Sequence, residues 1–382
     1  MKTNLKKLLY SGVTLMSLGV LAACSTTSSS TTTSSSVATS QTSVATSSSS
    51  TSSSSSSSSS SIDWSALPTT EVALSNDGLK ITEGGTYILT GSTTAGVTVE
   101  TDANVRIILA GADISSSDNA AINVIKADNV ELEIKDGTSN TVKDTSNHSD
   151  TNIEGAIHVE ADLTITGNGN LTVEGNFQDG IVSTDDLVIN ASNIKVTAVD
   201  DGIRGKDSLT INGGTIDVTA GGDGIKSTND TDTTKGYTRI TGGDITVKAG
   251  DDAIKAETAL TIDGGTITVP ESLEALEGTN ITINGGTLDV YGSDDAINAA
   301  STTSTDIYIK VTGGDLKVAV GSGDTDALDA NGDIYISGGT IDVTAPTSAF
   351  DFDGTAELTG GTVRVNGEQI SQIVATGPGA RW

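Results

Sequence analysis

Short runs of alternating hydrophobic and polar residues recur along the chain from residue 62 onward. Leu209-Thr210-Ile211 and Ile216-Asp217-Val218 are typical, and a Gly-Gly pair lies between them. Alternation with a period of two and many β-branched residues predict short strands that bury one face. The glycine pairs predict tight corners, because glycine accepts positive φ and close backbone approach. The same stretch shows no amphipathic helical spacing, so we expect an all-β fold.

A second repeating feature is an acidic residue followed by Gly or Ala and then by an apolar residue. Successive apolar positions are 22, 22, 29, 22, 21 and 31 residues apart, and polar insertions around residues 229–236 and 301–306 explain the two long intervals. The acids of this motif are Asp179, Asp201, Asp223, Asp252, Glu274, Asp295 and Asp326. A fixed period of this length indicates a solenoid.

Each repeat therefore holds about three short strands with turns between them. Stacking each strand on its counterpart one repeat later, at about 4.8 Å, would place Ile203, Ile225 and Ile254 in one interior ladder and Val218, Val247 and Val269 in another. We expect a single-stranded parallel β-helix over residues 62–382, with about ten coils and a length of roughly 50 Å. A β-sandwich is the alternative, but it does not require a repeat of 22 residues.

The first 61 residues differ in composition from the rest. Residues 1–23 carry three Lys followed by an apolar run, which is typical of a signal peptide, and Leu21-Ala22-Ala23-Cys24 resembles a lipobox with Cys24 as the lipidated residue. In Ser25–Ser61, 32 of 37 residues are Ser or Thr, so residues 24–61 are expected to form a disordered tether. We expect a protein anchored to the cell membrane by lipid, with its folded domain on the extracellular face.

The chain is strongly acidic, with 50 Asp and Glu against 20 Lys and Arg and a formal charge of −30. Without residues 1–23, 17 basic residues remain against 50 acids, giving −33. This charge argues against nucleic acid as a partner and against membrane contact beyond the lipid anchor. A single Cys excludes a disulfide framework and a Cys-rich zinc site, and two His leave little imidazole chemistry.

In a solenoid the acids of the repeat form a column of carboxylates. Two carboxylates about 5 Å apart repel by roughly 3 kcal/mol at an effective dielectric near 20, which favours a bound divalent cation. Calcium suits a set of oxygen donors best. Solvated acidic turns without metal are the alternative. The candidate metal ligands are Asp179, Asp200, Asp201, Asp223, Asp251, Asp252, Glu274, Asp294, Asp295, Asp324 and Asp326.

A row of basic residues, Arg204, Lys226 and Lys255, follows the apolar position of the motif in three successive repeats. These residues are either counter-charges for neighbouring acids or ligands for an anionic polysaccharide, and one of them could serve as the base of a β-elimination. Aromatic residues are few, with 11 in the chain, and the tyrosines do not recur on adjacent coils. A flat aromatic strip for crystalline cellulose is therefore not expected.

The segment Ile81–Gly91, together with the Asp-Asp-Gly/Ala-Ile and Gly-Gly-Thr-Ile-Asp-Val repeats, resembles a family of bacterial surface carbohydrate-binding proteins. The resemblance implies a right-handed parallel β-helix that carries calcium and binds acidic polysaccharide or cellulose. It extends in fold to calcium-dependent pectate lyases, in which Asp179, Asp200 and Asp201 look like the calcium ligands. Arg204 stands where such lyases would have a further acid, so the resemblance favours binding over cleavage.

We therefore expect a monomeric, lipid-anchored cell-surface protein that binds acidic, uronate-containing polysaccharide with the help of calcium and without catalysis. Arg204, Lys226 and Lys255 are the candidate ligand-binding residues. Two other functions remain open. The first is a calcium-dependent polysaccharide lyase with one of these three residues as the base, and the second is a non-catalytic adhesin or structural rod.

Overall fold

The computed structural model describes residues 62–323 and 325–376. The predicted signal peptide (1–23), the lipidation site Cys24, the tether (24–61) and the candidate ligand Asp324 lie outside the described residues. Within that part of the chain, the helical content is one short 3₁₀ turn, η1 (Trp64–Ala66), and no helix has the length and apolar character needed to cross a bilayer.

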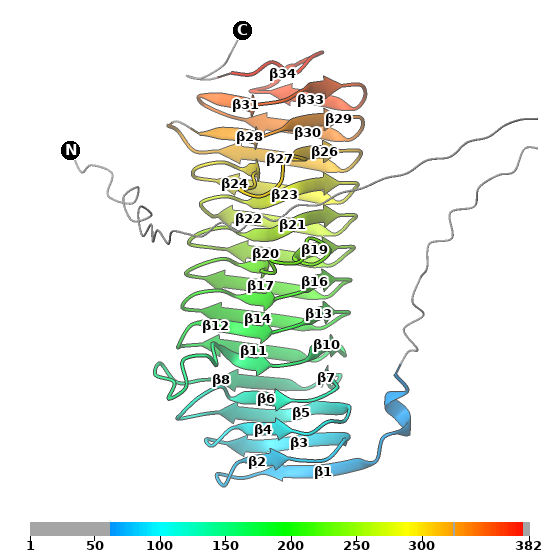
Figure 1. Ribbon diagram of the computed structural model, residues 1–382, viewed down its shortest axis with the longest axis vertical. Helices are drawn as coiled ribbons and strands as arrows, with labels where there is room; N and C mark the ends of the chain where they lie inside the picture. Colours follow the sequence, from blue (N-terminus) through cyan, green and yellow to red (C-terminus); the bar gives the residue numbers. More distant parts are fainter. Residues whose placement is uncertain (1–61, 324, 377–382) are drawn as a thin grey trace, which may run out of the picture. The chain divides into compact units, whose positions relative to one another are not determined.

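The described residues form 34 strands that belong to one sheet, and nearly all of the pairing is parallel. Most strands pair with the strand three positions later in the chain, so layers of strands follow one another in chain order (Figure 1). The pairing joins residues one repeat apart, as in Ile203 with Ile225 and Ile225 with Ile254. The all-β class and the parallel pairing at repeat spacing are confirmed.

The strands fall into three stacks. The first stack contains β2 (Leu79–Ile81), β4 (Val97–Glu100), β6 (Ile122–Lys126), β9 (Gly155–Val159), β12 (Asp179–Ser183), β15 (Ile203–Gly205), β18 (Ile225–Ser227), the start of β21 (Ile254–Ile262) and of β23 (Leu276–Ile283), β25 (Ile297–Ala299), β28 (Asp326–Ala330) and β31 (Ser348–Phe352). The second contains β7 (Asn129–Ile134), β10 (Asp162–Thr166), β13 (Asp186–Ile189), β16 (Ser208–Ile211), β19 (Tyr237–Ile240), the ends of β21 and β23, β26 (Tyr308–Val311), β29 (Asp333–Ile336) and β32 (Ala356–Leu358).

The third stack contains β8 (Ser139–Lys143), β11 (Asn170–Gly175), β14 (Asn193–Ala198), β17 (Thr215–Ala220), β20 (Asp244–Lys248), β22 (Thr266–Glu271), β24 (Thr287–Gly292), β27 (Asp315–Val320), β30 (Thr340–Thr344) and β33 (Thr362–Val365). The long strands β3 (Gly85–Thr93) and β5 (Val105–Ser115) run through both the second and third stacks, and β1 (Thr69–Leu74) pairs with β3. At the C-terminal end, β34 (Glu368–Gln369) pairs antiparallel with β33.

The core consists of aliphatic ladders inside the stacked strands. Ile203, Ile225 and Ile254 lie in register and are fully buried, as the repeat predicts. Val218 lies opposite Val247, and both are buried. Alternate residues in the strands face inward, which explains why strands such as β17 alternate between exposed and buried positions.

The glycine pairs form the corners before the strands of the third stack. Gly214 and Gly243, the second glycines of their pairs, have φ values of 101° and 108°, a region that other residues avoid. A side chain at Gly214 would also lie 2.5 Å from the carbonyl oxygen of Ser192 in the preceding coil. The corners thus require glycine for both conformation and space, as the sequence predicts.

Candidate functional site

The acids of the repeat lie one above another beside the first stack of strands, and their carboxylates accept hydrogen bonds from the backbone of the next coil. Oδ1 of Asp179 accepts a hydrogen bond from the backbone N–H of Asp201 at 3.1 Å, and Asp201 and Asp223 repeat this bond to Asp223 and Asp252 at 2.9 and 3.0 Å. All four residues are buried. One carboxylate oxygen of each of the first three acids is therefore used in a hydrogen bond that joins two successive coils.

The basic row lies beside these acids and pairs with them. Arg204, Lys226 and Lys255 are in register on successive strands. Arg204 Nη2 lies 2.8 Å from Asp179 Oδ2, and Lys226 Nζ lies 2.5 Å from Asp201 Oδ2 and 3.0 Å from Asp223 Oδ2. The second oxygen of each of these acids is therefore paired with a cation.

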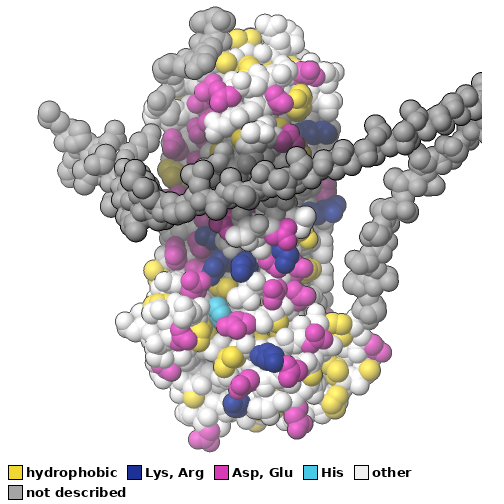
Figure 2. Space-filling model, viewed as in Figure 1, with side chains coloured by type: hydrophobic (Ala, Val, Ile, Leu, Met, Phe, Trp, Pro, Cys, Tyr) yellow, Lys and Arg dark blue, Asp and Glu magenta, His cyan; other side chains and the backbone are white. Residues whose placement is uncertain are grey.

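Lys255 continues the row, with Nζ 2.7 Å from Asp252 Oδ2 and an ion pair to Glu277. Burial alone would lower the pKa of Lys226, but the charges of Asp223 and Asp201 outweigh burial and raise it. The acids around Lys255 likewise raise its pKa against the effect of burial. Both amines are thus held in the protonated form. On the visible face, acidic side chains are spread over the molecule with basic side chains among them (Figure 2).

Two groups of three carboxylates converge closely enough to hold one cation. Asp179, Asp200 and Asp201 form the first group, whose ligand oxygens lie within 4.8 Å of one another. These are the residues that the family resemblance assigns to calcium. Burial raises the pKa of Asp179 to about 6 in spite of the opposing charge of Arg204. Because Arg204 and Lys226 pair with two of its three acids, the charge of this group is largely compensated.

The second group contains Asp252, Glu274 and Glu277, whose ligand oxygens also lie within 4.8 Å of one another. Burial and the neighbouring carboxylate of Glu277 raise the pKa of Asp252, and burial together with the charges of Asp252 and Asp295 raises the pKa of Glu274 to about 7. Nδ2 of Asn298 donates to Glu274 at 2.9 Å, while its buried Oδ1 has no hydrogen-bond partner among residues 62–323 and 325–376. This group thus carries three acids for one cation, Lys255, and has a free amide oxygen beside it.

The position that holds the basic row changes from basic residues to mainly acidic residues in the later coils. After Lys255, the same position is occupied by Glu277, Asn298, Asp329 and Asp351. Burial, followed by repulsion from Asp295, raises the pKa of Asp329 to about 7, and burial raises the pKa of Asp295 to about 6. The C-terminal coils therefore hold acids whose charge is not compensated within this register.

Sequence reasoning missed Glu277 and Asp329 although a signal was present. Both follow the apolar residue of the repeat at the offset that defines the basic row, so extending that row by position would have found them. Among the predicted ligands outside the two groups, Asp223 is buried and paired, Asp251 and Asp294 are exposed, and Asp295 Oδ1 accepts from the backbone of Asp326 at 2.7 Å.

The two histidines lie on the N-terminal side of the acids. His148 Nε2 bonds Asp144 at 3.0 Å, and the ring stacks on Phe177 with the centroids 4.3 Å apart. His158 is buried in register with Val182, and burial together with the positive charge of Arg204 lowers its pKa to about 4. His158 is therefore neutral at physiological pH.

Comparison with known proteins gives this geometry a context. A carbohydrate-binding domain-containing protein of Acetivibrio thermocellus is 33% identical over 135 residues, which are 33% of this chain and 47% of that protein. The chain thus spans about half the length of the curated relative it matches. A solved polysaccharide lyase-like protein from C. thermocellum, studied as a gadolinium derivative, superposes with a TM-score of 0.51 at 32% identity, covering 57% of this chain and 93% of that one.

The likeness to the solved structure, at a TM-score of 0.51, supports the all-β architecture described above. A family model for carbohydrate-binding domain-containing proteins matches residues 75–327, which is more than half of the chain and includes both groups of three carboxylates. This protein therefore belongs to the family of carbohydrate-binding domain-containing proteins.

Proposed function

We propose that this protein is a cell-surface lipoprotein whose right-handed parallel β-helix of about ten coils binds acidic polysaccharide with the help of calcium. The group Asp252, Glu274 and Glu277 carries the proposal, because three carboxylates converge there around one cation. Family membership supports the polysaccharide as the partner. The predicted leader and Cys24 supply the anchor.

The residues of the second group fit calcium by their chemistry. Three carboxylates and the unpartnered Oδ1 of Asn298 offer oxygen donors, which calcium prefers. The raised pKa of Glu274 shows that negative charge is costly there, and a divalent cation would remove that cost. A bound calcium ion would supply the positive charge that lets a uronate carboxylate approach an acidic surface.

The first group, Asp179, Asp200 and Asp201, fits calcium less well. Two cations, Arg204 and Lys226, already pair with Asp179 and Asp201, whereas one cation, Lys255, pairs with the acids of the second group. We therefore place calcium first at the second group.

Two measurements test this function. The first is calorimetric titration with calcium, and the second is binding of polygalacturonate with and without a chelator. Glu274→Gln together with Glu277→Gln should weaken calcium binding by about tenfold or more and should abolish chelator-sensitive binding of polygalacturonate. Asp244→Asn is the matched control, because Asp244 is an exposed acid in the third stack. The proposal would be refuted if the affinity for polygalacturonate were the same with and without the chelator and the same in the double variant as in the wild type.

A polysaccharide lyase is the second candidate, favoured by the likeness to the lyase-like protein. Its base would be Arg204, Lys226 or Lys255. Burial lowers the pKa of Lys226, but its two acids outweigh burial and raise it, which argues against Lys226 as a base, since a base must be unprotonated. Sustained formation of unsaturated uronate from polygalacturonate, followed by ultraviolet absorbance, would establish the lyase instead.

A further inference from the structure

Two insertions project from the corner between the first and second stacks. Residues 228–236 separate β18 from β19, and residues 300–307 separate β25 from β26. Between these coils, β21 and β23 run through the corner without a break. The insertions therefore stand three coils apart, roughly 14 Å at 4.8 Å per coil, with two continuous strands between them.

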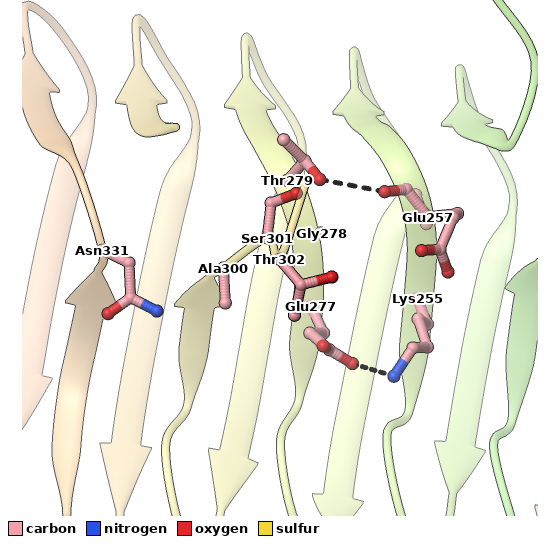
Figure 3. A pocket seen from close by; sticks show the side chains of 10 residues that line it. Lys255, Glu257, Glu277, Gly278, Thr279, Ala300, Ser301, Thr302 and Asn331 are labelled. Carbon is pink, nitrogen blue, oxygen red and sulfur yellow. Dashed lines mark hydrogen bonds and ion pairs between the residues drawn. The ribbon is translucent and has the colours of Figure 1, made fainter. Parts of the chain in front are cut away.

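Two cavities adjoin each other here, the first lined by β21, β23, the second insertion and Asn331, and the second lined by both insertions. One has a volume of about 290 Å³ and the other about 280 Å³, and both are lined by Glu257 and Thr279. In Figure 3, Lys255 and Glu277 point toward each other at one end of the first cavity, while Thr279 bonds the backbone oxygen of Glu257 at the other end. Together they form one trough, whose size falls within the range of about 300–1,000 Å³ that is usual for ligand pockets.

The wall formed by residues 228–236 is held in place by hydrogen bonds to the strands below it. The carboxylate of Asp207 accepts from Asn229 Nδ2 at 2.6 Å and pairs with Lys235. Thr258 Oγ1, from β21, donates to the carbonyl oxygen of Lys235 at 2.6 Å. On the opposite wall, Ser301 Oγ accepts from the backbone N–H of Thr303 and Ser304. Walls that are fixed in advance reduce the entropy lost when a ligand binds.

An exposed tyrosine lines the trough. Tyr237 follows the first insertion and is 38% exposed. Ala259 and Asn280 lie in register between the two insertions, and Tyr308 continues the same register beyond the second insertion. The floor therefore carries Ala259 and Asn280 at this position, with an aromatic ring at one wall. A ring with an apolar face and a polar tip suits the alternating apolar and hydroxyl faces of a sugar.

The lining is rich in hydroxyl groups and is not basic. Lys255 is its cation, and it is already paired with Asp252 and Glu277. Asp230, Glu257 and Glu277 are its acids. This charge disfavours an anionic ligand, whereas the threonine and serine hydroxyls suit an uncharged ligand with many hydroxyls.

From this geometry we propose that the trough between the two insertions is a second carbohydrate site, which binds one uncharged glycan chain without calcium and uses Tyr237 as its stacking platform. The chain lies along β21 and β23, across the direction in which the coils stack. This site shares Lys255 and Glu277 with the edge of the acidic face, but its floor and its tyrosine are separate from the acids assigned to calcium.

Calorimetric titration of the complete protein with cellohexaose, xylohexaose and mannohexaose, in the presence of a chelator, tests the proposal. At least one of these neutral hexasaccharides should bind. Tyr237→Ala should weaken that binding by about tenfold or more, and Tyr237→Trp should retain it, because an aromatic face is kept. Tyr291→Ala is the matched control, since Tyr291 is similarly exposed but lies on β24 in the third stack.

Three outcomes would overturn the second site. They are the failure of all three hexasaccharides to bind, an equal loss in Tyr237→Ala and Tyr291→Ala, and complete loss of binding on chelation. Calcium-dependent binding of polygalacturonate, measured on the same variants, should be unchanged by Tyr237→Ala. The second site and the calcium-dependent function therefore fail or stand independently.

Discussion

Replacing Lys226 by methionine removes one cation from between two buried acids while keeping a long apolar stem. Lys226 Nζ lies 2.5 Å from Asp201 Oδ2 and 3.0 Å from Asp223 Oδ2, and both carboxylate side chains are 9% exposed. In the variant, two carboxylates about 5 Å apart would repel by roughly 3 kcal/mol at an effective dielectric of 20. Removing one partner of a buried ion pair costs about 3–5 kcal/mol, so we expect a loss of about 3 kcal/mol.

Urea denaturation followed by circular dichroism, at neutral pH and with a chelator, measures this loss. Lys195→Met is the matched control, because Lys195 Nζ lies 3.9 Å from Asp217 and both side chains are more than half exposed. Such a surface pair contributes about 0–1 kcal/mol. Added calcium should restore more stability to Lys226→Met than to the wild type, since two carboxylates lose their partner.

The reasoning fails if Lys226→Met is no less stable than Lys195→Met. That result would mean that Asp201 and Asp223 are satisfied by their backbone hydrogen bonds alone, which measure 2.9 and 3.0 Å from Oδ1. It would also remove the argument that uncompensated charge further along the stack calls for a metal ion.

The other predictions concern pH, packing and the anchor. Burial raises the pKa values of Asp329 and Glu274 to about 7, from 3.8 and 4.5, so the folded chain binds more protons than the unfolded chain between these values. The free energy of unfolding in chelator should therefore fall as pH rises from about 4 to 8. Asp329→Asn should flatten this slope in urea titrations. Gly202→Ala should cost about 1–3 kcal/mol or more of unfolding free energy by the same assay, because its Cβ would lie 2.3 Å from Val218 Cγ1. Cys24→Ser should move the protein from the membrane fraction to the medium in cell fractionation, whereas retention on the membrane would refute the lipid anchor.

The architecture could be predicted because each repeat contains the residues that define one coil. The acid, the apolar residue and the glycine pair recur at fixed spacing, and each corresponds to one feature of the coil. Ile203, Ile225 and Ile254 stack in register, and Gly214 and Gly243 turn with positive φ. Such features depend on neighbouring coils alone, which is why a period read from sequence predicts them.

The site was less predictable because it depends on which oxygen faces which neighbour. The basic row suggested either counter-charges or ligand contacts, and the distances from Arg204 and Lys226 to the acids favour the counter-charges. The trough was unpredictable for a different reason. Its walls come from insertions about 70 residues apart. Tyr237 precedes Thr238, which pairs with Leu260, and the neighbouring register runs from Ala259 through Asn280 to Tyr308. A comparison of adjacent repeats could not reveal it.

One position of the repeat links these observations. It carries Arg204, Lys226 and Lys255 in three coils and then Glu277, Asn298 and Asp329. In the first three coils, the acidic column is neutralised by residues of the chain itself, so it can be buried without any other cation. From Glu277 onward, the same position adds acidity, and the pKa of Asp329 rises to about 7 through burial and the neighbouring carboxylates. Because each coil interacts mainly with its neighbours, the uncompensated charge begins where Lys255 meets Glu277 and continues through the second half of the column. The acidity of this protein is therefore compensated within the stack where lysine and arginine accompany it, and where they do not, it is the basis of the calcium binding that we propose.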